Sequence, residues 1–248
     1  MKFFHYILAI FCLLPLSASG QSYKSLWKQV EEASKKDLPK TEMEKLSLII
    51  DKASREKSYG HLLKASLRNT QVMCALTPDS ISGQVARLER MEQEARAKDP
   101  VLAAVWNTVL GCLYRDNYQL GRSKAEPYFK AALQQPELLA RHKVSEYQQL
   151  IENGYDGRWF DNDLLSVIGY EAKGYAVLHN YYRNTSLRTA ACLTACEMVR
   201  SGHWNGGKYL PSSERRRLVD SLLTVYGDIK VAGELAVYRY SLMDSSDE

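Results

Sequence analysis

Apolar side chains recur every three or four residues along nearly the whole chain after residue 20. This spacing places them on one face of an α-helix, whereas a half-buried strand needs strict alternation of polar and apolar residues. No stretch alternates for long enough to predict a strand. The pattern therefore predicts an all-α fold, and its strongest stripe consists of Leu102, Val105, Trp106, Val109 and Leu113.

Proline and glycine mark the ends of the predicted helices. Every proline after residue 20 falls at the edge of an apolar segment, where a missing backbone N–H costs least. Asp99 before Pro100 has the residue types of a helix N-cap followed by the first helical position. Gly60 and Gly202 follow periodic runs, so each is predicted to end a helix as its C-cap.

The predicted helices are short, numerous and joined by brief turns, which favours stacked helical hairpins. One stretch follows the spacing of a tetratricopeptide repeat, apart from about two extra residues in its turn. The residues that carry this spacing are Leu110, Gly111, Tyr114, Ala125, Phe129, Ala132 and Pro136. The sequence thus predicts a tetratricopeptide-like (TPR-like) α-solenoid, with an irregular helical bundle as the alternative.

Four parts follow one another along the chain in this interpretation. Residues 1–20 have the pattern of a signal peptide, with Lys2 before an apolar run and the small residues Ala18 and Gly20 at its end. Residues 21–152 are predicted to form an N-terminal helical-repeat array, residues 153–163 a connecting loop, and residues 164–248 C-terminal helical hairpins. No later segment has the apolar length of a transmembrane helix, so we expect export to the periplasm or the cell surface.

The charge balance gives no sign of a nucleic-acid partner. The chain has 33 basic and 29 acidic residues, and their signs alternate instead of forming blocks. The longest basic run, residues 215–217, would point in three directions on a helix, whereas nucleic-acid binding needs a basic stripe on one face.

The cysteines do not indicate a disulfide scaffold. Four of them in the predicted exported chain are too few for a fold that depends on disulfides, and a chain of this length can build its own core. No histidine stands at a spacing that would complete a zinc site with them. We therefore predict buried free thiols at Cys74, Cys112, Cys192 and Cys196.

Motifs that carry chemistry are sparse. The histidines after residue 20 are far apart, and neither a nucleophile elbow, a zinc-protease helix nor a phosphate-binding loop occurs. Asp161 and Asp163 begin like a calcium loop, but Leu165 and Ala172 stand where oxygen ligands are needed. Asp163 is instead predicted to cap the following helix. The sequence predicts a protein that is not an enzyme and that holds no metal or cofactor.

Two polar loops carry large aromatic side chains, which either cover the ends of the core or contact a partner. The first loop contains Trp159 and Phe160, and the second contains Trp204 and Tyr209. We treat these four residues as candidates for partner binding.

Several segments carry a resemblance to a known family. They are residues 25–31, 36–40, 57–60, 161–169, 178–182 and 188–192. In these segments the chain resembles the N-terminal helical region of alpha-2-macroglobulin family proteins of Bacteroidetes. Members of that family are large extracytoplasmic proteins that trap proteases, with β-rich macroglobulin domains and, in many, a Cys-Gly-Glu-Gln thioester. This chain contains neither feature. The resemblance implies a periplasmic or surface location and a macroglobulin-like chain or domain as partner within a protease-inhibitor system.

Two functions remain open at this point. The first is a protein-interaction module, and the second is a periplasmic glycan-binding protein that stacks a sugar on Trp159 or Trp204. An exposed aromatic platform beside carboxylates would favour the glycan, whereas a broad apolar groove would favour the protein partner.

Overall fold

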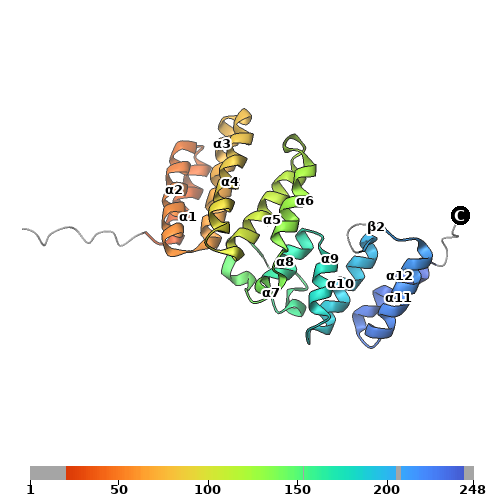
Figure 1. Cartoon of the computed structure of the whole chain (residues 1–248). Helices are drawn as coiled ribbons and strands as arrows, with labels where there is room; N and C mark the ends of the chain where they lie inside the picture. The colour runs from red at the N-terminus through yellow and green to blue at the C-terminus, as the bar shows by residue number, and fades with distance from the viewer. Residues whose placement is uncertain (1–20, 153, 205–207, 243–248) are drawn as a thin grey trace, which may run out of the picture.

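The computed structural model describes residues 21–152, 154–204 and 208–242, with the backbone alone for residues 203, 204, 208 and 209. These residues form twelve α-helices and one antiparallel pair of two-residue strands (Figure 1). The helices are α1 (Tyr23–Lys35), α2 (Pro39–Glu56), α3 (Tyr59–Leu76), α4 (Ile81–Arg96), α5 (Pro100–Asp116), α6 (Ala125–Ala132), α7 (Pro136–Leu139), α8 (Leu164–Glu171), α9 (Tyr175–Tyr182), α10 (Arg188–Ser201), α11 (Ser212–Tyr226) and α12 (Gly233–Ser241). The strands are β1 (His203–Trp204) and β2 (Lys208–Tyr209).

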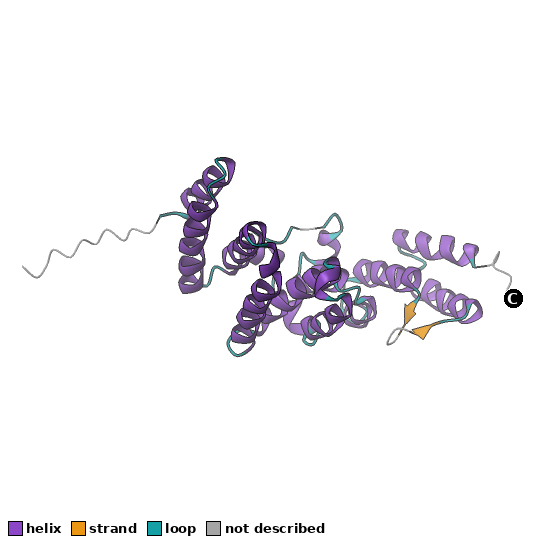
Figure 2. Cartoon of the chain, turned by 90° about the horizontal axis from the view of Figure 1, so that it is seen from above, coloured by secondary structure: helices purple, strands orange, loops and turns teal. Residues whose placement is uncertain are grey.

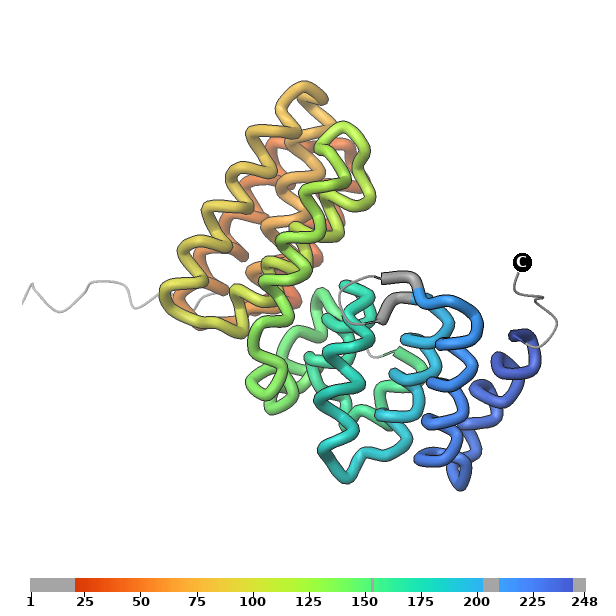
Figure 3. The backbone as a smooth tube through the Cα atoms, turned by 45° about the vertical axis from the view of Figure 1, so that its right-hand side comes forward, coloured from red at the N-terminus to blue at the C-terminus, as the bar shows by residue number. Residues whose placement is uncertain are grey.

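Successive helices pack against each other, so the order of the helices in space follows their order in the sequence. Figure 1 shows this progression from α1 at one end of the molecule to α12 at the other, and Figure 2 shows the same progression from above. In Figure 3 the first helices and the last helices form two arms that meet through α5 and the segments that follow it. The fold is an all-α solenoid of stacked helical hairpins, which confirms the sequence prediction.

The hairpin of α5 and α6 shows how the repeat spacing produces close packing. A Cβ on Gly111 would lie 2.6 Å from the Phe129 ring, so a residue larger than glycine would require this ring to shift. Ala132 is 1 % exposed at the same seam. The rings of Tyr114 and Tyr128 stack with centroids 5.4 Å apart. This hairpin therefore has the alternation of small and large residues that the sequence predicted.

Of the three helix ends predicted at Asp99, Gly60 and Gly202, two are confirmed. Asp99 accepts hydrogen bonds from the backbone N–H groups of Val101 and Leu102, at 3.1 and 3.0 Å, and Pro100 begins α5. Gly202 ends α10 in the left-handed region with φ of 68°. The prediction for Gly60 is wrong, because this residue lies inside the first turn of α3, where a Cβ would approach the Tyr147 backbone to 3.3 Å. Close packing explains that glycine.

Residues 154–163, which we expected to form a connecting loop, fold back onto the rest of the chain. The Val144 N–H donates to the Asn162 carbonyl at 3.0 Å, and the Leu164 N–H donates to the His142 carbonyl at 2.9 Å. Phe160, in a short 3-10 helix, is 2 % exposed. The segment is thus held against the core by its backbone and by a buried ring.

Buried apolar side chains form two clusters. The larger one extends from Leu63 in α3 to Leu242 after α12, and it includes residues on both sides of the connecting segment. The smaller one joins α1, α2 and α3. The four cysteines after residue 20 are free thiols, as predicted, but only Cys192 and Cys196 are buried, whereas Cys74 and Cys112 are partly buried. The predicted signal peptide and Asn153 lie outside the described residues.

Candidate functional site

A largely apolar groove follows four helices of the described chain. It consists of two adjoining hollows, of about 560 and about 480 Å³, and Leu67, Gln71 and Leu150 line both of them. The walls come mainly from α1, α3, α5 and α8, which are separated along the chain by helices on the other side of the hairpins. We call this surface the α1–α8 groove. Its apolar residues are Trp27, Val30, Leu67, Val105, Val109, Leu113, Leu150, Ile151, Val167 and Ile168.

The sequence of α5 explains why this groove is apolar. Val105, Val109 and Leu113 are spaced by four residues, so they form one row along the groove. Leu110 and Tyr114 are buried on another face, with exposed fractions of 0 % and 6 %. A helix with apolar residues on more than one face is normally buried all round. Here Val109 and Leu113 remain partly exposed, so α5 presents its second apolar face to the groove.

At the α1–α3 end, the groove is lined by three basic and two acidic side chains. Arg68 donates to Glu42 at 2.6 Å and to the Ser34 hydroxyl at 2.9 Å, and Glu42 is 4 % exposed. The Lys64 ammonium lies 4.9 Å from the centroid of a Trp27 ring. Because Arg68 is paired with Glu42, the remaining charges at this end are Lys35 and Lys64 against Glu31, which leaves a small positive excess.

The α5–α8 end of the groove is acidic. Asp116, Glu152 and Glu171 line it, and none of the described residues that line this end is basic. Arg115, beside the groove, offsets part of this charge by donating to Glu171 at 2.7 Å and to Asp116 at 2.8 Å. The groove is therefore apolar along its middle and has charges of opposite sign at its two ends.

Cys112 lies in the same acidic end, with its Sγ 3.3 Å from Oε1 of Glu171. Burial and the neighbouring Glu171 carboxylate raise the pKa of the Cys112 thiol to about 12. A thiol is a nucleophile only as the thiolate, so Cys112 stays protonated and unreactive near neutral pH. Its chemistry in the groove is that of a weak hydrogen-bond donor.

Trp159 and Phe160, two of the four residues proposed from the sequence as partner contacts, are not among the described residues that line this groove. Trp159 is 39 % exposed, and the Arg158 guanidinium lies 4.9 Å from the centroid of one of its rings. Phe160 packs edge-to-face on Tyr170 and Tyr182, so it supports its loop from within. The side chains of Trp204 and Tyr209 are outside the described residues. Their backbones belong to the β1–β2 pair, in which Trp204 faces Lys208 and His203 faces Tyr209.

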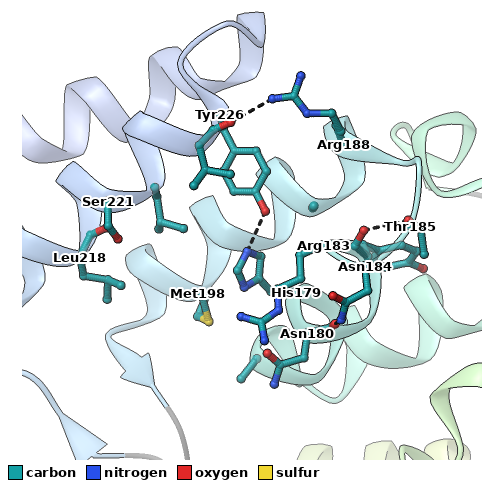
Figure 4. A pocket seen from close by; sticks show the side chains of 15 residues that line it. His179, Asn180, Arg183, Asn184, Thr185, Arg188, Met198, Leu218, Ser221 and Tyr226 are labelled. Atoms are coloured by element: carbon teal, nitrogen blue, oxygen red, sulfur yellow. Dashed lines mark hydrogen bonds between the residues drawn. The ribbon is translucent and has the colours of Figure 1, made fainter.

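A second cavity, of about 900 Å³, lies between α9, α10 and α11 (Figure 4). His179 of α9 and Tyr226 of α11 bridge it, with 3.0 Å between Nε2 and the phenol oxygen. Burial, and then the positive charge of Arg183, lower the pKa of His179 to about 4, so the imidazole is neutral near pH 7. The exposed fraction of His179 is 8 %, so this imidazole is a buried, hydrogen-bonded part of the core.

The cap predicted for α8 also forms, and it belongs to a buried polar cluster. Asp163 accepts from the Ser166 N–H at 2.8 Å and from the Tyr182 hydroxyl at 2.8 and 2.9 Å. Asp163 is 2 % exposed and Tyr182 is fully buried. Burial raises the pKa of the Asp163 carboxyl. These hydrogen bonds explain Asp163 as the cap of α8 and the partner of the Tyr182 hydroxyl.

Within the described ranges, no three His, Cys, Asp or Glu side chains are grouped so that they could hold a metal ion. None of the helices described is both long enough and apolar enough to cross a membrane. Comparison of the chain with protein-family models, with curated proteins and with solved structures finds no match.

Neither the groove nor the lining of the second cavity is predicted by the sequence. A signal for the groove was present in α5, where apolar positions occupy more faces than one stripe needs. The lining of the second cavity comes from three helices that are separate in the sequence, so spacing alone could not assemble it.

Proposed function

We propose that this chain is an exported, non-catalytic helical-repeat protein that holds a segment of a partner protein in the α1–α8 groove. The observation that carries the proposal is the continuity of the groove, whose two hollows are joined through Leu67, Gln71 and Leu150. Extended apolar surfaces on soluble proteins commonly mark interaction sites. Helical-repeat proteins use the surface made by their stacked hairpins in this way.

The groove specifies the chemistry of its occupant. Apolar side chains of the partner segment would cover Val109 and Leu113, as in other complexes in which an amphipathic segment lies in an apolar groove. A basic residue of the segment would lie near Glu152 and Glu171, and an acidic residue near Lys64. Complementary charges of this kind set the orientation of a bound segment more than its affinity. The occupant is thus an amphipathic segment with opposite charges at its two ends.

The identity of the partner is proposed from the sequence. The segments that resemble the helical region of alpha-2-macroglobulin family proteins support a macroglobulin-like chain or domain as the partner. The signal-peptide pattern of residues 1–20 supports a periplasmic or cell-surface location. In this proposal the chain positions a protease-inhibitor protein and does not itself inhibit a protease.

The glycan-binding alternative has less support. It requires an exposed aromatic face beside carboxylates, but the Arg158 guanidinium covers a face of Trp159. Asp161, in the same loop, is paired with Lys143 at 2.6 Å. Tyr155, 92 % exposed, is the most open aromatic side chain of this loop, and Arg158 lies near its ring as well, 5.9 Å from the centroid.

The experiment compares a blocked groove with a matched change elsewhere. Gln71 is exposed and lines both hollows, so Gln71→Trp fills their junction without disturbing the core. Leu48→Trp on α2 is the control, because Leu48 is 48 % exposed and lines neither hollow. Each protein is immobilised and exposed to a periplasmic extract, and bound macroglobulin-like protein is quantified by mass spectrometry.

We expect the wild-type protein and Leu48→Trp to retain the same macroglobulin-like protein, and Gln71→Trp to lose most of it. Because the ends of the groove are charged, Glu152→Lys should weaken retention, and high salt should weaken retention by the wild-type protein. Equal retention by all variants would contradict binding in the groove. Retention on a glycan column that Trp159→Ala abolishes would instead support the alternative.

A further inference from the structure

The cavity between α9 and α11 is independent of the α1–α8 groove and has a different composition. Both helices pack on α10, and the cavity is the space that they leave above it. Small and buried residues of α10, Ala191 and Met198, form part of its floor, with exposed fractions of 1 % and 3 %. Its volume of about 900 Å³ is within the range of pockets that enclose a small organic molecule.

One side of this cavity is apolar. Leu218, Leu222 and Val225 line it from α11, and Val225 is 55 % exposed. Ala176 contributes a small apolar side chain from α9. In Figure 4 Leu218 lies across the cavity from the polar residues of α9. An apolar body of a ligand would therefore be buried against α11.

The opposite side is polar and cationic. Asn180, Arg183 and Asn184 belong to α9 and the turn after it, and Figure 4 shows them together on that side. Among the residues that the structure describes, none that lines the cavity is Asp or Glu. The positive charge of Arg183 reaches the bridge inside the cavity, because it acts with burial to lower the pKa of His179.

The two arginines of the cavity differ in their partners. Arg188 is neutralised by Asp228, with contacts of 2.7 and 2.9 Å, and it also donates to the Val225 carbonyl. Arg183 is exposed and makes no ion pair or hydrogen bond within the ranges that the structure describes. The side-chain amide of Asn180, three residues earlier, is likewise unbonded there. The cavity thus offers one uncompensated positive charge with an amide donor beside it.

We propose that this cavity binds a small amphipathic acid, with its oxyanion at Arg183 and Asn180 and its apolar body against Leu222 and Val225. A guanidinium binds carboxylate and phosphate oxygens with charge-assisted hydrogen bonds. The neutral His179–Tyr226 bridge adds hydrogen-bonding groups without a negative charge that would repel the anion. The proposal does not depend on the protein-binding function of the groove, and either one can fail without the other.

Binding is tested by titrating the purified protein with octanoate, octyl phosphate and octan-1-ol. The methyl resonance of Met198, assigned with Met198→Leu, reports from the cavity floor. We expect at least one of the two acids to shift this resonance until the shift saturates. Octan-1-ol should bind at least about tenfold more weakly than that acid. The two acids distinguish a carboxylate ligand from a phosphate ligand.

Two arginine variants locate the anion. Arg183→Gln removes the unpaired charge and should weaken binding of the acid about tenfold or more. Arg217→Gln, at an exposed site of α11 that does not line the cavity, should leave binding unchanged. Both positions are exposed, so unfolding measurements are expected to show folded proteins. The proposal would be overturned if neither acid shifted the Met198 methyl resonance. It would also be overturned if Arg183→Gln bound the acid as tightly as the wild type, or if octan-1-ol bound as tightly as the acid.

Discussion

The solenoid has a first arm, α1–α6, and a second arm, α8–α12, and the two arms bury polar groups in different ways. In α1–α6 the buried carboxylates, Glu42 and Glu92, are paired with Arg68 and Arg96, whose side chains extend toward solvent. In α8–α12 the corresponding groups are Asp163 with Tyr182, and His179 with Tyr226, and the hydrogen bonds of both pairs lie within the core. Breaking a surface-reaching pair leaves an arginine that water can solvate, whereas breaking a core pair leaves a buried polar group without a partner. The second arm is therefore the more sensitive one to loss of a single polar side chain.

The largest effect is expected at the cap of α8. Asp163→Ala removes the acceptor for both the Ser166 N–H and the buried Tyr182 hydroxyl, so the free energy of unfolding should fall by about 3 kcal/mol. Urea unfolding measures the difference. Asp163→Asn keeps an acceptor, and burial already raises the pKa of this carboxyl, so the amide should cost only about 1 kcal/mol.

The matched change in the first arm is Glu92→Ala. Glu92 accepts from Arg96 and from the Asn107 amide, but the Arg96 side chain is 65 % exposed and can be hydrated after the change. We expect a loss of about 1–2 kcal/mol, smaller than that of Asp163→Ala. An equal or larger loss for Glu92→Ala would remove the difference between the arms.

Acid should destabilise the protein mainly through the second arm. The pKa of His179 is lowered to about 4 in the folded protein, against about 6.5 when unfolded, so its neutral form stabilises the fold above pH 6.5. That contribution is lost as the pH falls, because the unfolded chain binds the proton first, and it amounts to about 2 kcal/mol between pH 7 and pH 5.

Two histidine variants show how much of this pH dependence comes from each histidine. Burial also lowers the pKa of His61, which accepts a hydrogen bond from the Trp27 indole at 2.9 Å in the first arm. The free energy of unfolding is measured at both pH values for His179→Gln and His61→Gln. We expect the pH dependence to flatten more in His179→Gln. A steeper or unchanged slope in that variant would show that another group is responsible.

The smallest predicted difference concerns glycines at the helix seams. A Cβ on Gly169 would overlap the fully buried Leu178, whereas a Cβ on Gly111 would meet the ring of Phe129, which is partly exposed and therefore less enclosed by the core. Gly169→Ala should therefore destabilise by about 2 kcal/mol and Gly111→Ala by about 1 kcal/mol or less, since alanine favours the helix. Thermal unfolding of the two variants compares them, and the reverse order would mean that the first arm is the more tightly packed.

The local pattern of the sequence predicts much of the structure of the first arm. The spacing of Leu110, Gly111 and Tyr114 predicted the α5–α6 hairpin, and Asp99 with Pro100 predicted the start of α5. These features depend on residues a few positions apart, so periodicity and capping rules detect them. Gly60 was misinterpreted, because its neighbour Tyr147 is distant in the sequence and only the folded chain brings them together.

The candidate surfaces could not be predicted in the same way. The α1–α8 groove joins Trp27 to Val167, and the second cavity joins Arg183 to Val225. Such pairs are set by how the hairpins stack, which local propensity does not specify. The large aromatic residues Trp159 and Phe160 stood out in the sequence, yet Phe160 is buried and Trp159 lies outside both surfaces.

The central claim, that the α1–α8 groove holds a segment of a partner protein, is tested most directly by cross-linking from inside it. A photoreactive amino acid is placed at Gln71 in one protein and at Leu48 in another, and the cross-linked peptide is sequenced from periplasmic extract. We predict that Gln71 captures an amphipathic segment of a single macroglobulin-like protein, with a basic residue at one end, and that Leu48 does not. Cross-links from Leu48 to the same segment, or unrelated peptides from Gln71, would contradict the claim.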